Sequence, residues 1–504
     1  MVTKMGDIYQ AFYTKSDPIT GAMVDALSIS AGMHVLEPCG GDGVFVDALL
    51  AHEPDLDIDV YELDPTAVST LQTKYAHQEN VVNIFHDDTL TSPTLRLAAM
   101  RGGIYDRIIA NPPYGAWQDY SRRDSLKKLF PDLYVKETYT LFLYKSLELL
   151  KNDGILVFII PDTFLNLHRH TAVRNIILRQ SRILNIKLFP SSFFPDVNFG
   201  YAGLSILTLQ KTFDESLCME NEFSVDVGFE SEKALCDPDG AERRYYFNQK
   251  DVLAQADHAL FISDNPAVTH HINTAVSKIG DIAACVTGFY SGDDKRYLRS
   301  GNITVRNGKK YAIVDDDLVH TGYPSPMEKL SGLTNGSNFI PVVKGGNVQY
   351  YKPDLWYMDW GAAAVQQYKT SKKARFQNPS YYFREGIGVP MVSSSKITAS
   401  LLNGRLFDQS IVGIFPHDDS DTLYLLAFFN SPTCNTLIRT INPTANNSAN
   451  YIKKIPFLKP DRTAQKRINT IIDTIISSLK SGKNDVAVKL ETEMHDIIKS
   501  IYGF

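Results

Sequence analysis

The sequence predicts an α/β chain: a doubly wound sheet domain, then an α+β domain, then C-terminal helices. Short apolar segments rich in β-branched residues alternate with segments of helical periodicity as far as about residue 210, which is the order that builds a parallel sheet covered by helices. Polar residues directly follow several of these apolar segments, as they do where ligands bind beyond the carboxyl ends of parallel strands. From residue 280 to residue 460 the chain is instead rich in Gly, Asn, Ser and Tyr, and its apolar runs are short.

In the first domain, strands and helices are expected to alternate along the chain. The apolar spacing predicts helices at residues 19–29, 44–50, 66–75 and 139–150, and strands at residues 34–36, 58–61, 81–85, 107–110, 155–160, 183–188 and 204–209. Because such strands need helical crossovers to run parallel, the sheet is expected to be parallel and doubly wound.

Changes of composition along the chain predict the domain boundaries. The first domain is expected over residues 1–215, and a weakening of the apolar pattern predicts a linker or insertion over residues 216–246. A loop-rich α+β binding domain is expected over residues 247–460. In residues 461–504, isoleucines recur at helical spacing after the N-cap residue Asp461, which predicts a helical hairpin.

The overall composition is that of a folded, water-exposed protein. Hydrophobic residues make up 44% and charged residues 21% of the 504 residues, and no segment approaches the ~18 uninterrupted apolar residues that a membrane span needs. Disordered, fibrous and integral membrane proteins are therefore excluded as classes. The N-terminus has no signal-peptide pattern, and the five cysteines are scattered, so we expect a reducing cytoplasm and no disulfide framework or zinc module.

The net charge by itself argues against a nucleic-acid partner. Lys and Arg number 51, and Asp and Glu number 57, which gives a formal net charge of −6. Where the charges lie decides whether that inference holds.

The first expected strand ends in a turn with glycines between acidic residues, Glu37-Pro38-Cys39-Gly40-Gly41-Asp42-Gly43. Glycines permit a tight turn and a close approach of the backbone to a ligand, and the helix that follows offers N–H groups. The spacing differs from G-x-G-x-x-G. The two carboxylates would repel a pyrophosphate, whereas they suit a cationic ligand that has an amino group.

Acidic residues also follow the next two strands. Glu62-Leu63 follows the second strand, where a carboxylate can hold two ribose hydroxyls, and Asp87-Asp88-Thr89 follows the third, where a carboxylate could meet an adenine amino group. Together these sites resemble the class I S-adenosylmethionine-dependent methyltransferases. The resemblance implies S-adenosylmethionine as cofactor, with Asp87 an equally placed alternative to Asp88. The implied cofactor-binding residues are Glu37, Pro38, Gly41, Asp42, Gly43, Glu62, Leu63, Asp88, Thr89 and Asn111.

The fourth expected strand ends in Asn111-Pro112-Pro113-Tyr114. Two prolines in series fix the backbone and remove two N–H donors, so this loop presents hydrogen-bond acceptors. The Asn111 side-chain oxygen and the Pro112 carbonyl could accept both hydrogens of an amino group on an aromatic ring and so aim its lone pair at a methyl donor. Such chemistry requires no metal, and Tyr114 could stack on a base turned out of the duplex.

This motif, placed after the cofactor motifs, resembles the gamma group of N6-adenine DNA methyltransferases, the TaqI-type enzymes of type II restriction–modification systems. The resemblance covers residue 6 to about residue 210 and implies that Asn111, Pro112, Pro113 and Tyr114 are catalytic. It also implies a cofactor-contacting segment at Phe12-Tyr13-Thr14, with Lys15 where the family usually has Pro. An aromatic wall for the flipped base is implied at Phe194, with Phe199 as the alternative.

A basic stretch in the second expected domain suggests a target recognition domain. Residues 344–375 contain six basic and two acidic residues, with Asn, Gln and Tyr between them. Basic side chains bind phosphates, while Asn, Gln and Arg can read base edges. The residues expected to contact DNA are Lys344, Asn347, Gln349, Tyr350, Lys372, Lys373 and Arg375.

The expected partners follow from this interpretation: double-stranded DNA, and a restriction endonuclease that acts on the same site without a stable complex. We expect a monomer in a prokaryotic or phage-infected cytoplasm, with no membrane contact. Glutamine in a protein poses the same lone-pair problem, and structured RNA is another possible substrate. Because the amino group of cytosine is chemically alike, adenine rests on the resemblance. The intact Asn111–Tyr114 motif argues against a catalytically silent binding protein.

Overall fold

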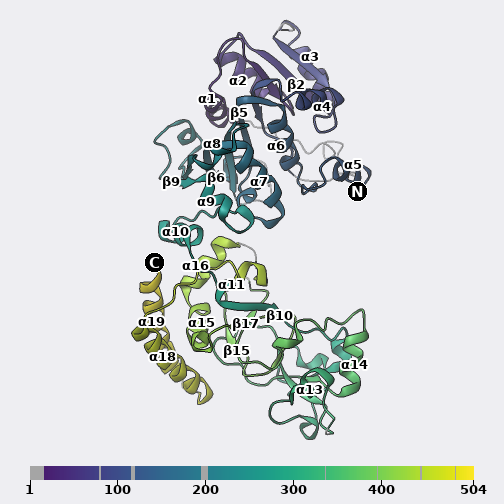
Figure 1. Cartoon of the computed structure of the whole chain (residues 1–504), viewed down its shortest axis with the longest axis vertical. Coiled ribbons are helices and arrows are strands. Elements are labelled where there is room, and N and C mark those ends of the chain that lie inside the picture. The colour runs from purple at the N-terminus through teal and green to yellow at the C-terminus, as the bar shows by residue number, and fades with distance from the viewer. Residues whose placement is uncertain are drawn as a thin grey trace. The chain divides into compact units, whose positions relative to one another are not determined.

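The computed structural model describes residues 16–78, 81–114, 120–194, 203–334, 336–393, 396–442, 445–482 and 484–504. The chain divides into two compact units, Met1–Leu260 and Phe261–Phe504 (Figure 1). They are called the first unit and the second unit below. The division therefore falls inside the segment expected as the second domain, residues 247–460.

A mixed sheet forms the centre of the first unit, with the strand order β3-β2-β1-β4-β5-β7-β6-β8-β9. Neighbouring strands from β3 through β5 run parallel, as expected. β7 runs antiparallel to both β5 and β6, which the apolar pattern did not predict. The register shows how: β7 begins at Gly203, opposite Pro190 at the end of β6, so the chain returns beside β6 in the opposite direction. The strands are β1 (His34–Glu37), β2 (Asp57–Glu62), β3 (Val82–His86), β4 (Tyr105–Ala110), β5 (Leu150–Pro161), β6 (Ser181–Pro190), β7 (Gly203–Lys211), β8 (Glu222–Val227) and β9 (Arg243–Asn248).

The expected linker over residues 216–246 is instead part of this sheet. β8 pairs with β6, and β9 pairs with β8 at the edge. Along β9, partly buried residues alternate with exposed ones, so the strand has a polar face and no continuous apolar run. Arg244 on β9 pairs with the buried Asp226 on β8 at 2.6 Å. The charged residues that resembled a linker are therefore those of a solvated edge strand.

The helices of the first unit agree with the sequence where their apolar stripe is clear. The expected ones are α1 (Asp17–Leu27), α2 (Val44–His52), α3 (Pro65–Lys74) and α6 (Thr138–Leu149), and those not predicted are α4 (Pro93–Met100), α5 (Tyr120–Leu129), α7 (Thr171–Gln180), α8 (Glu215–Met219) and α9 (Gln249–Ala254). The sequence of α5 is polar on most sides, so it has no apolar periodicity to recognise.

The second unit contains two small sheets in its described part, with strand orders β10-β17-β14-β15 and β11-β13-β12-β16. The strands are β10 (Ala283–Thr287), β11 (Leu298–Ser300), β12 (Phe339–Val343), β13 (Trp356–Asp359), β14 (Ile387–Pro390), β15 (Ser400–Leu401), β16 (Leu406–Phe407) and β17 (Ile411–Pro416). The core around them is strongly aromatic: the rings of Phe289 and Trp360 contact each other, and each also contacts the rings of Tyr368 and Tyr382. This arrangement agrees with the loop-rich α+β domain expected from the sequence.

Helices complete the second unit. They are α10 (Pro266–Thr274), α11 (Ile279–Ile282), α12 (Asp294–Tyr297), α13 (Pro326–Ser331), α14 (Ala362–Thr370), α15 (Thr422–Phe429), α16 (Pro432–Ile441), α17 (Ala449–Ile452), α18 (Arg462–Lys480) and α19 (Asn484–Tyr502). As predicted, α18 and α19 form the C-terminal hairpin, and the Asp461 side chain caps α18 by accepting from Ala464 N at 2.8 Å. Within the described residues, no helix is both long and apolar enough to span a membrane.

Candidate active site

The glycine turn after β1 is closed by tight backbone contacts. Gly43 has φ of 79°, and a Cβ there would lie 2.5 Å from the Tyr75 hydroxyl oxygen. That hydroxyl donates to the Gly43 carbonyl at 2.8 Å. At Gly40, a Cβ would meet Val60 Cγ1 at 2.3 Å. The turn can therefore be built only with glycine at these positions, and it presents its backbone at the carboxyl edge of the sheet.

Glu62, at the end of β2, is anchored to this turn. Its Oε2 accepts from Gly41 N at 2.8 Å, and its Oε1 accepts from Leu63 N at 2.7 Å and Asp64 N at 2.8 Å. Three amides thus orient the carboxylate. Because each carboxylate oxygen can accept two hydrogen bonds, Oε2 can still accept one from a ligand hydroxyl.

Glu37, the last residue of β1, is a buried carboxylate whose Oε2 has no hydrogen-bond partner among the described residues. The residue as a whole is only 2% exposed. Burial raises the pKa of Glu37 well above its usual range, and the carboxylates of Glu62 and Asp42 raise it further. Such an atom is costly unless a ligand satisfies it, and a cation with N–H groups is the ligand that suits it.

The polar side chains that follow β3 already make some hydrogen bonds within the protein. The buried Thr89 hydroxyl donates to the Pro38 carbonyl at 2.6 Å and so ties this strand end to the glycine turn. Asp88 Oδ1 accepts from Leu90 N at 3.1 Å, and its Oδ2 pairs with Arg122 at 3.0 Å. Asp87 accepts from Asp88 N at 2.8 Å. The choice between Asp87 and Asp88 as the adenine contact stays a prediction.

The Asn-Pro-Pro-Tyr loop follows β4, next to β1 in the sheet. Cys39 Sγ in the glycine turn donates to the Asn111 carbonyl at 3.5 Å, and the Thr138 hydroxyl donates to the Pro113 carbonyl at 2.6 Å. The predicted cofactor and catalytic loops are therefore in contact. Sequence reasoning missed Thr138, because no local pattern relates a helix start to a loop 25 residues earlier.

Tyr114 lies in the protein core. The residue is 1% exposed, its hydroxyl donates to the Ile159 carbonyl on β5 at 3.1 Å, and its ring meets Tyr139 edge-on at 6.3 Å. Burial raises the pKa of its hydroxyl well above the usual value. In this conformation the ring is covered, so stacking on a base would require the ring or its cover to move.

Phe194 is also buried, at 5% exposed, and its backbone N–H donates to the Ser191 carbonyl at 3.0 Å. Its alternative, Phe199, lies outside the described residues, as do Tyr13 and Thr14 of the expected N-terminal cofactor segment. The roles predicted for these three residues remain expectations.

In the second unit, two residues predicted to contact DNA pair or pack within the protein. The Lys344 ammonium pairs with Asp408 at 2.6 Å and Asp294 at 3.0 Å. Burial alone would lower the pKa of Lys344, but these two carboxylates raise it above its usual value. Tyr350 is 1% exposed and cannot reach a DNA surface from that position. The buried Tyr350 is therefore not available to DNA in this conformation, whereas DNA contact by the partly exposed Lys344 stays a prediction. A local charge count does not reveal the partners of Lys344, because they are distant in sequence.

The other predicted contacts remain available at the surface. Asn347, Lys372, Lys373 and Arg375 are exposed. Gln349 is partly buried and accepts from Lys396 Nζ at 3.4 Å. These positions are compatible with a DNA-contacting surface.

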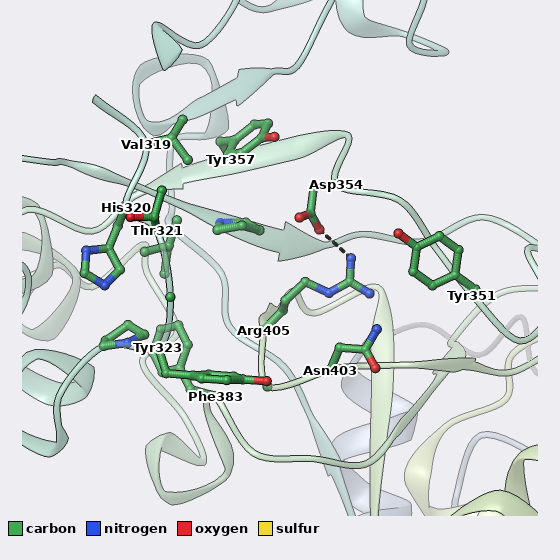
Figure 2. Close-up of a pocket in the computed structure, with 15 residues that line it drawn as sticks. Val319, His320, Thr321, Tyr323, Tyr351, Asp354, Tyr357, Phe383, Asn403 and Arg405 are labelled. Atoms are coloured by element: carbon green, nitrogen blue, oxygen red, sulfur yellow. Dashed lines mark hydrogen bonds and ion pairs between the residues drawn. The ribbon is translucent and has the colours of Figure 1, made fainter. Parts of the chain in front are cut away.

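A cavity of about 440 Å³ also lies in the second unit (Figure 2). Aromatic side chains, including Tyr323, Tyr357 and Phe383, line it together with Arg405. The Arg405 guanidinium pairs with Asp354 at 2.7 Å and also donates to backbone carbonyls. The residues predicted to contact DNA do not line this cavity.

At the opposite edge of the first unit's sheet, a cluster of His34, Asp57 and Asp59 places potential metal-ligand atoms within 4.8 Å of one another. The group is already hydrogen-bonded internally. Asp59 Oδ2 lies 3.1 Å from His34 Nε2 and accepts from the Tyr105 hydroxyl at 2.7 Å. Asp59 is thus held by hydrogen bonds within the protein.

Comparison with known proteins gives a family match within the first unit. Residues 54–194 match the family model described as Eco57I restriction-modification methylase. The chain is 32% identical over 169 residues to Type II methyltransferase M.AccI of Acinetobacter calcoaceticus, covering 32% of this chain and 30% of that protein. It is 33% identical over 169 residues to Modification methylase CviBIII of Paramecium bursaria Chlorella virus NC1A, covering 33% and 41%. It is 26% identical over 160 residues to Adenine-specific methyltransferase PglX of Lacticaseibacillus casei (strain Zhang), covering 30% and 13%.

The matches thus span less than half of the length of each of these relatives. Together with the strand order, they confirm the class I methyltransferase fold expected for the first unit. The similarity is to modification methyltransferases of restriction–modification systems.

Proposed function

We propose that the chain transfers the methyl group of S-adenosylmethionine to the exocyclic N6 amino group of an adenine turned out of double-stranded DNA. The observation that carries this proposal is the contact between the two loops. The glycine turn begins at the buried Glu37, whose Oε2 has no hydrogen-bond partner in the described part of the chain, and it touches the Asn-Pro-Pro-Tyr loop through the 3.5 Å bond from Cys39 to Asn111. An amino group held by Asn111 would lie beside the cofactor region.

The buried strand-end residues suit S-adenosylmethionine. Glu37 would accept from the amino group of the cofactor, and Glu62, already oriented by three amides, would accept from a ribose hydroxyl. Asp87 or Asp88 would meet the adenine. When bound, the cofactor supplies a methyl group that its positively charged sulfur makes electrophilic.

The catalytic residues then act by orientation. The Asn111 side-chain oxygen and the Pro112 carbonyl would accept the two hydrogens of the target amino group, which draws its lone pair out of conjugation with the ring. Tyr114 and Phe194 would form the apolar walls of the base pocket, after the ring of Tyr114 leaves its present contact with Ile159.

DNA is favoured over protein glutamine or RNA by two observations. M.AccI and CviBIII are described as a type II methyltransferase and a modification methylase, and PglX as adenine-specific. The second unit also adds a large loop-rich body with an exposed basic group, Lys372, Lys373 and Arg375, which suits a polyanion. In this setting, a restriction endonuclease that reads the same sequence would be the functional partner.

The test is methyl transfer from labelled S-adenosylmethionine to methylation-free genomic DNA, with base analysis of the product. Asn111→Ala should reduce transfer by at least about 10²- to 10³-fold, the usual effect of removing one preorganised hydrogen-bonding group. Cofactor affinity should change little. The exposed Asn152 provides the control substitution, Asn152→Ala. Label in RNA or in a glutamine peptide but not in DNA would overturn the choice of substrate, and label in cytosine would overturn the choice of base.

A further inference from the structure

The Pro112 carbonyl, to which the proposed reaction gives an orienting role, lies between two peptide units that are fixed from outside the loop. On one side, the Asn111 carbonyl accepts from Cys39 Sγ at 3.5 Å. On the other side, the Pro113 carbonyl accepts from the Thr138 hydroxyl at 2.6 Å. Neither proline has an N–H with which the loop could hold itself. The direction of the Pro112 carbonyl therefore depends on these outside contacts.

Thr138 is well placed to be the stronger of the two supports. Its 2.6 Å bond is shorter than the 3.5 Å bond from the thiol, and a hydroxyl is a better donor than a thiol. The residue is 5% exposed and is the first of helix α6. A β-branched side chain at a buried helix start has few alternative rotamers, so its hydroxyl holds a fixed position.

The next residue on α6 supports the same loop. The Tyr139 ring meets the Tyr114 ring edge-on at 6.3 Å, and the Tyr139 hydroxyl lies 3.1 Å from His170 Nε2. His170 in turn lies 2.8 Å from Glu137 Oε2. The start of α6 is thus held by a buried polar network, and adjacent residues of this helix contact adjacent residues of the loop.

We propose that Thr138 is a positioning residue for methyl transfer, which rests on the function proposed above. Through the Pro113 carbonyl, it fixes the tilt of the peptide units around Pro112, so that the acceptors for the target amino group converge. Thr138 itself contacts neither the target nor the cofactor in this role.

Replacing Thr138 by Val removes the hydroxyl and keeps the shape of the side chain. In single-turnover methylation of methylation-free genomic DNA by the full chain, Thr138→Val should slow the methyl-transfer step by roughly 10- to 100-fold, since small misplacement of reacting groups has effects of that size. The affinity for S-adenosylmethionine, the KM for DNA and the thermal unfolding temperature should stay close to those of the parent. Thr138→Ser restores the hydroxyl and should recover most of the rate.

Thr140→Val is the matched control. Thr140 is 1% exposed on the same helix, and its hydroxyl donates to the Glu137 carbonyl at 2.9 Å instead of to the loop. A rate loss equal in Thr138→Val and Thr140→Val, or a loss that follows the unfolding temperature, would show a structural role and overturn the proposal. So would an unchanged rate in Thr138→Val. If the parent chain itself transfers no methyl group to DNA, the proposed function fails. If the parent is active and the Thr138→Val variant is equally fast, only the role proposed for Thr138 fails.

Discussion

Two ionisable side chains, the buried Glu37 in the first unit and the partly exposed Lys344 in the second, differ in what surrounds them. Glu37 has an oxygen without a hydrogen-bond partner among the described residues, and other carboxylates lie near it. Lys344 lies between two carboxylates that pair with it, at 2.6 and 3.0 Å. A buried ionisable group without a partner indicates a site for a ligand that can satisfy it, whereas a group paired within the protein indicates a role in the fold.

The difference also explains why net charge was a poor guide to function. The formal charge of −6 includes carboxylates that gather at the carboxyl edge of the sheet in the first unit. In the second unit, part of the excess positive charge of residues 344–375 is paired or buried within the protein. Lys344 is paired, and Lys352 is buried with its Nζ donating to the Lys344 carbonyl at 2.7 Å. Burial lowers the pKa of Lys352 to about 8, so it loses its charge as pH rises only slightly above neutrality.

The contrast between Glu37 and Lys344 predicts that the largest loss of stability follows from replacing Lys344. Lys344→Met would leave the carboxylates of Asp408 and Asp294 without their cation. Removal of one partner from a fully buried pair destabilises by about 3–5 kcal/mol, so this partly exposed cluster should lose less than that amount. Hydrogen exchange of the second unit in the parent and the variant would measure this loss. The exposed Lys372 supplies the control, Lys372→Met, which should leave protection unchanged. A stable Lys344→Met protein with weakened DNA binding would support Lys344 as a DNA contact.

The second prediction concerns Glu37, and its two effects have opposite signs. Glu37→Gln should weaken S-adenosylmethionine binding by about 10- to 100-fold, through loss of a charge-assisted hydrogen bond worth about 1.5–3 kcal/mol. The cofactor-free protein should become more stable at neutral pH, because the substitution removes a buried carboxylate. Calorimetric titration and thermal unfolding would measure the two effects, with the exposed Glu230→Gln as control.

The pH dependence of that stability gain follows from the direction of the Glu37 pKa shift. Because the folded pKa is raised, the folded protein retains a proton that the unfolded chain releases above its ordinary carboxyl pKa of about 4.3. The parent therefore loses stability as pH rises from that value through the folded pKa, whereas Glu37→Gln does not. The stability difference should be small at acid pH and grow toward neutrality. A difference independent of pH would contradict the assigned titration.

Much of the first unit was predictable because its buried strands appear in the sequence as continuous apolar runs, each followed by polar residues. That pattern located the ends of β1, β2, β3 and β4, and with them the residues of the candidate site. It did not locate β9, because the sequence of this edge strand has no continuous apolar run and so resembles a linker. Nor did it locate α5, which lacks an apolar stripe. Thr138 and the partners of Lys344 were hidden for a related reason: these contacts join residues 25, 50 and 64 positions apart, and a local pattern contains no information about them.

The smallest predicted effect distinguishes exposed basic residues within the second unit. Lys372 and Lys373 are exposed, and if they contact DNA phosphates, replacing both with Gln should weaken binding uniformly across sequences. Each lost phosphate contact lowers the slope of log affinity against log salt by about 0.9, so the double variant should lose up to about two units of slope. The adjacent, exposed pair Lys309 and Lys310 provides the control in the same unit. If both double variants reduce the slope equally, binding follows net charge alone; if only the first does, residues 372 and 373 belong to the DNA interface.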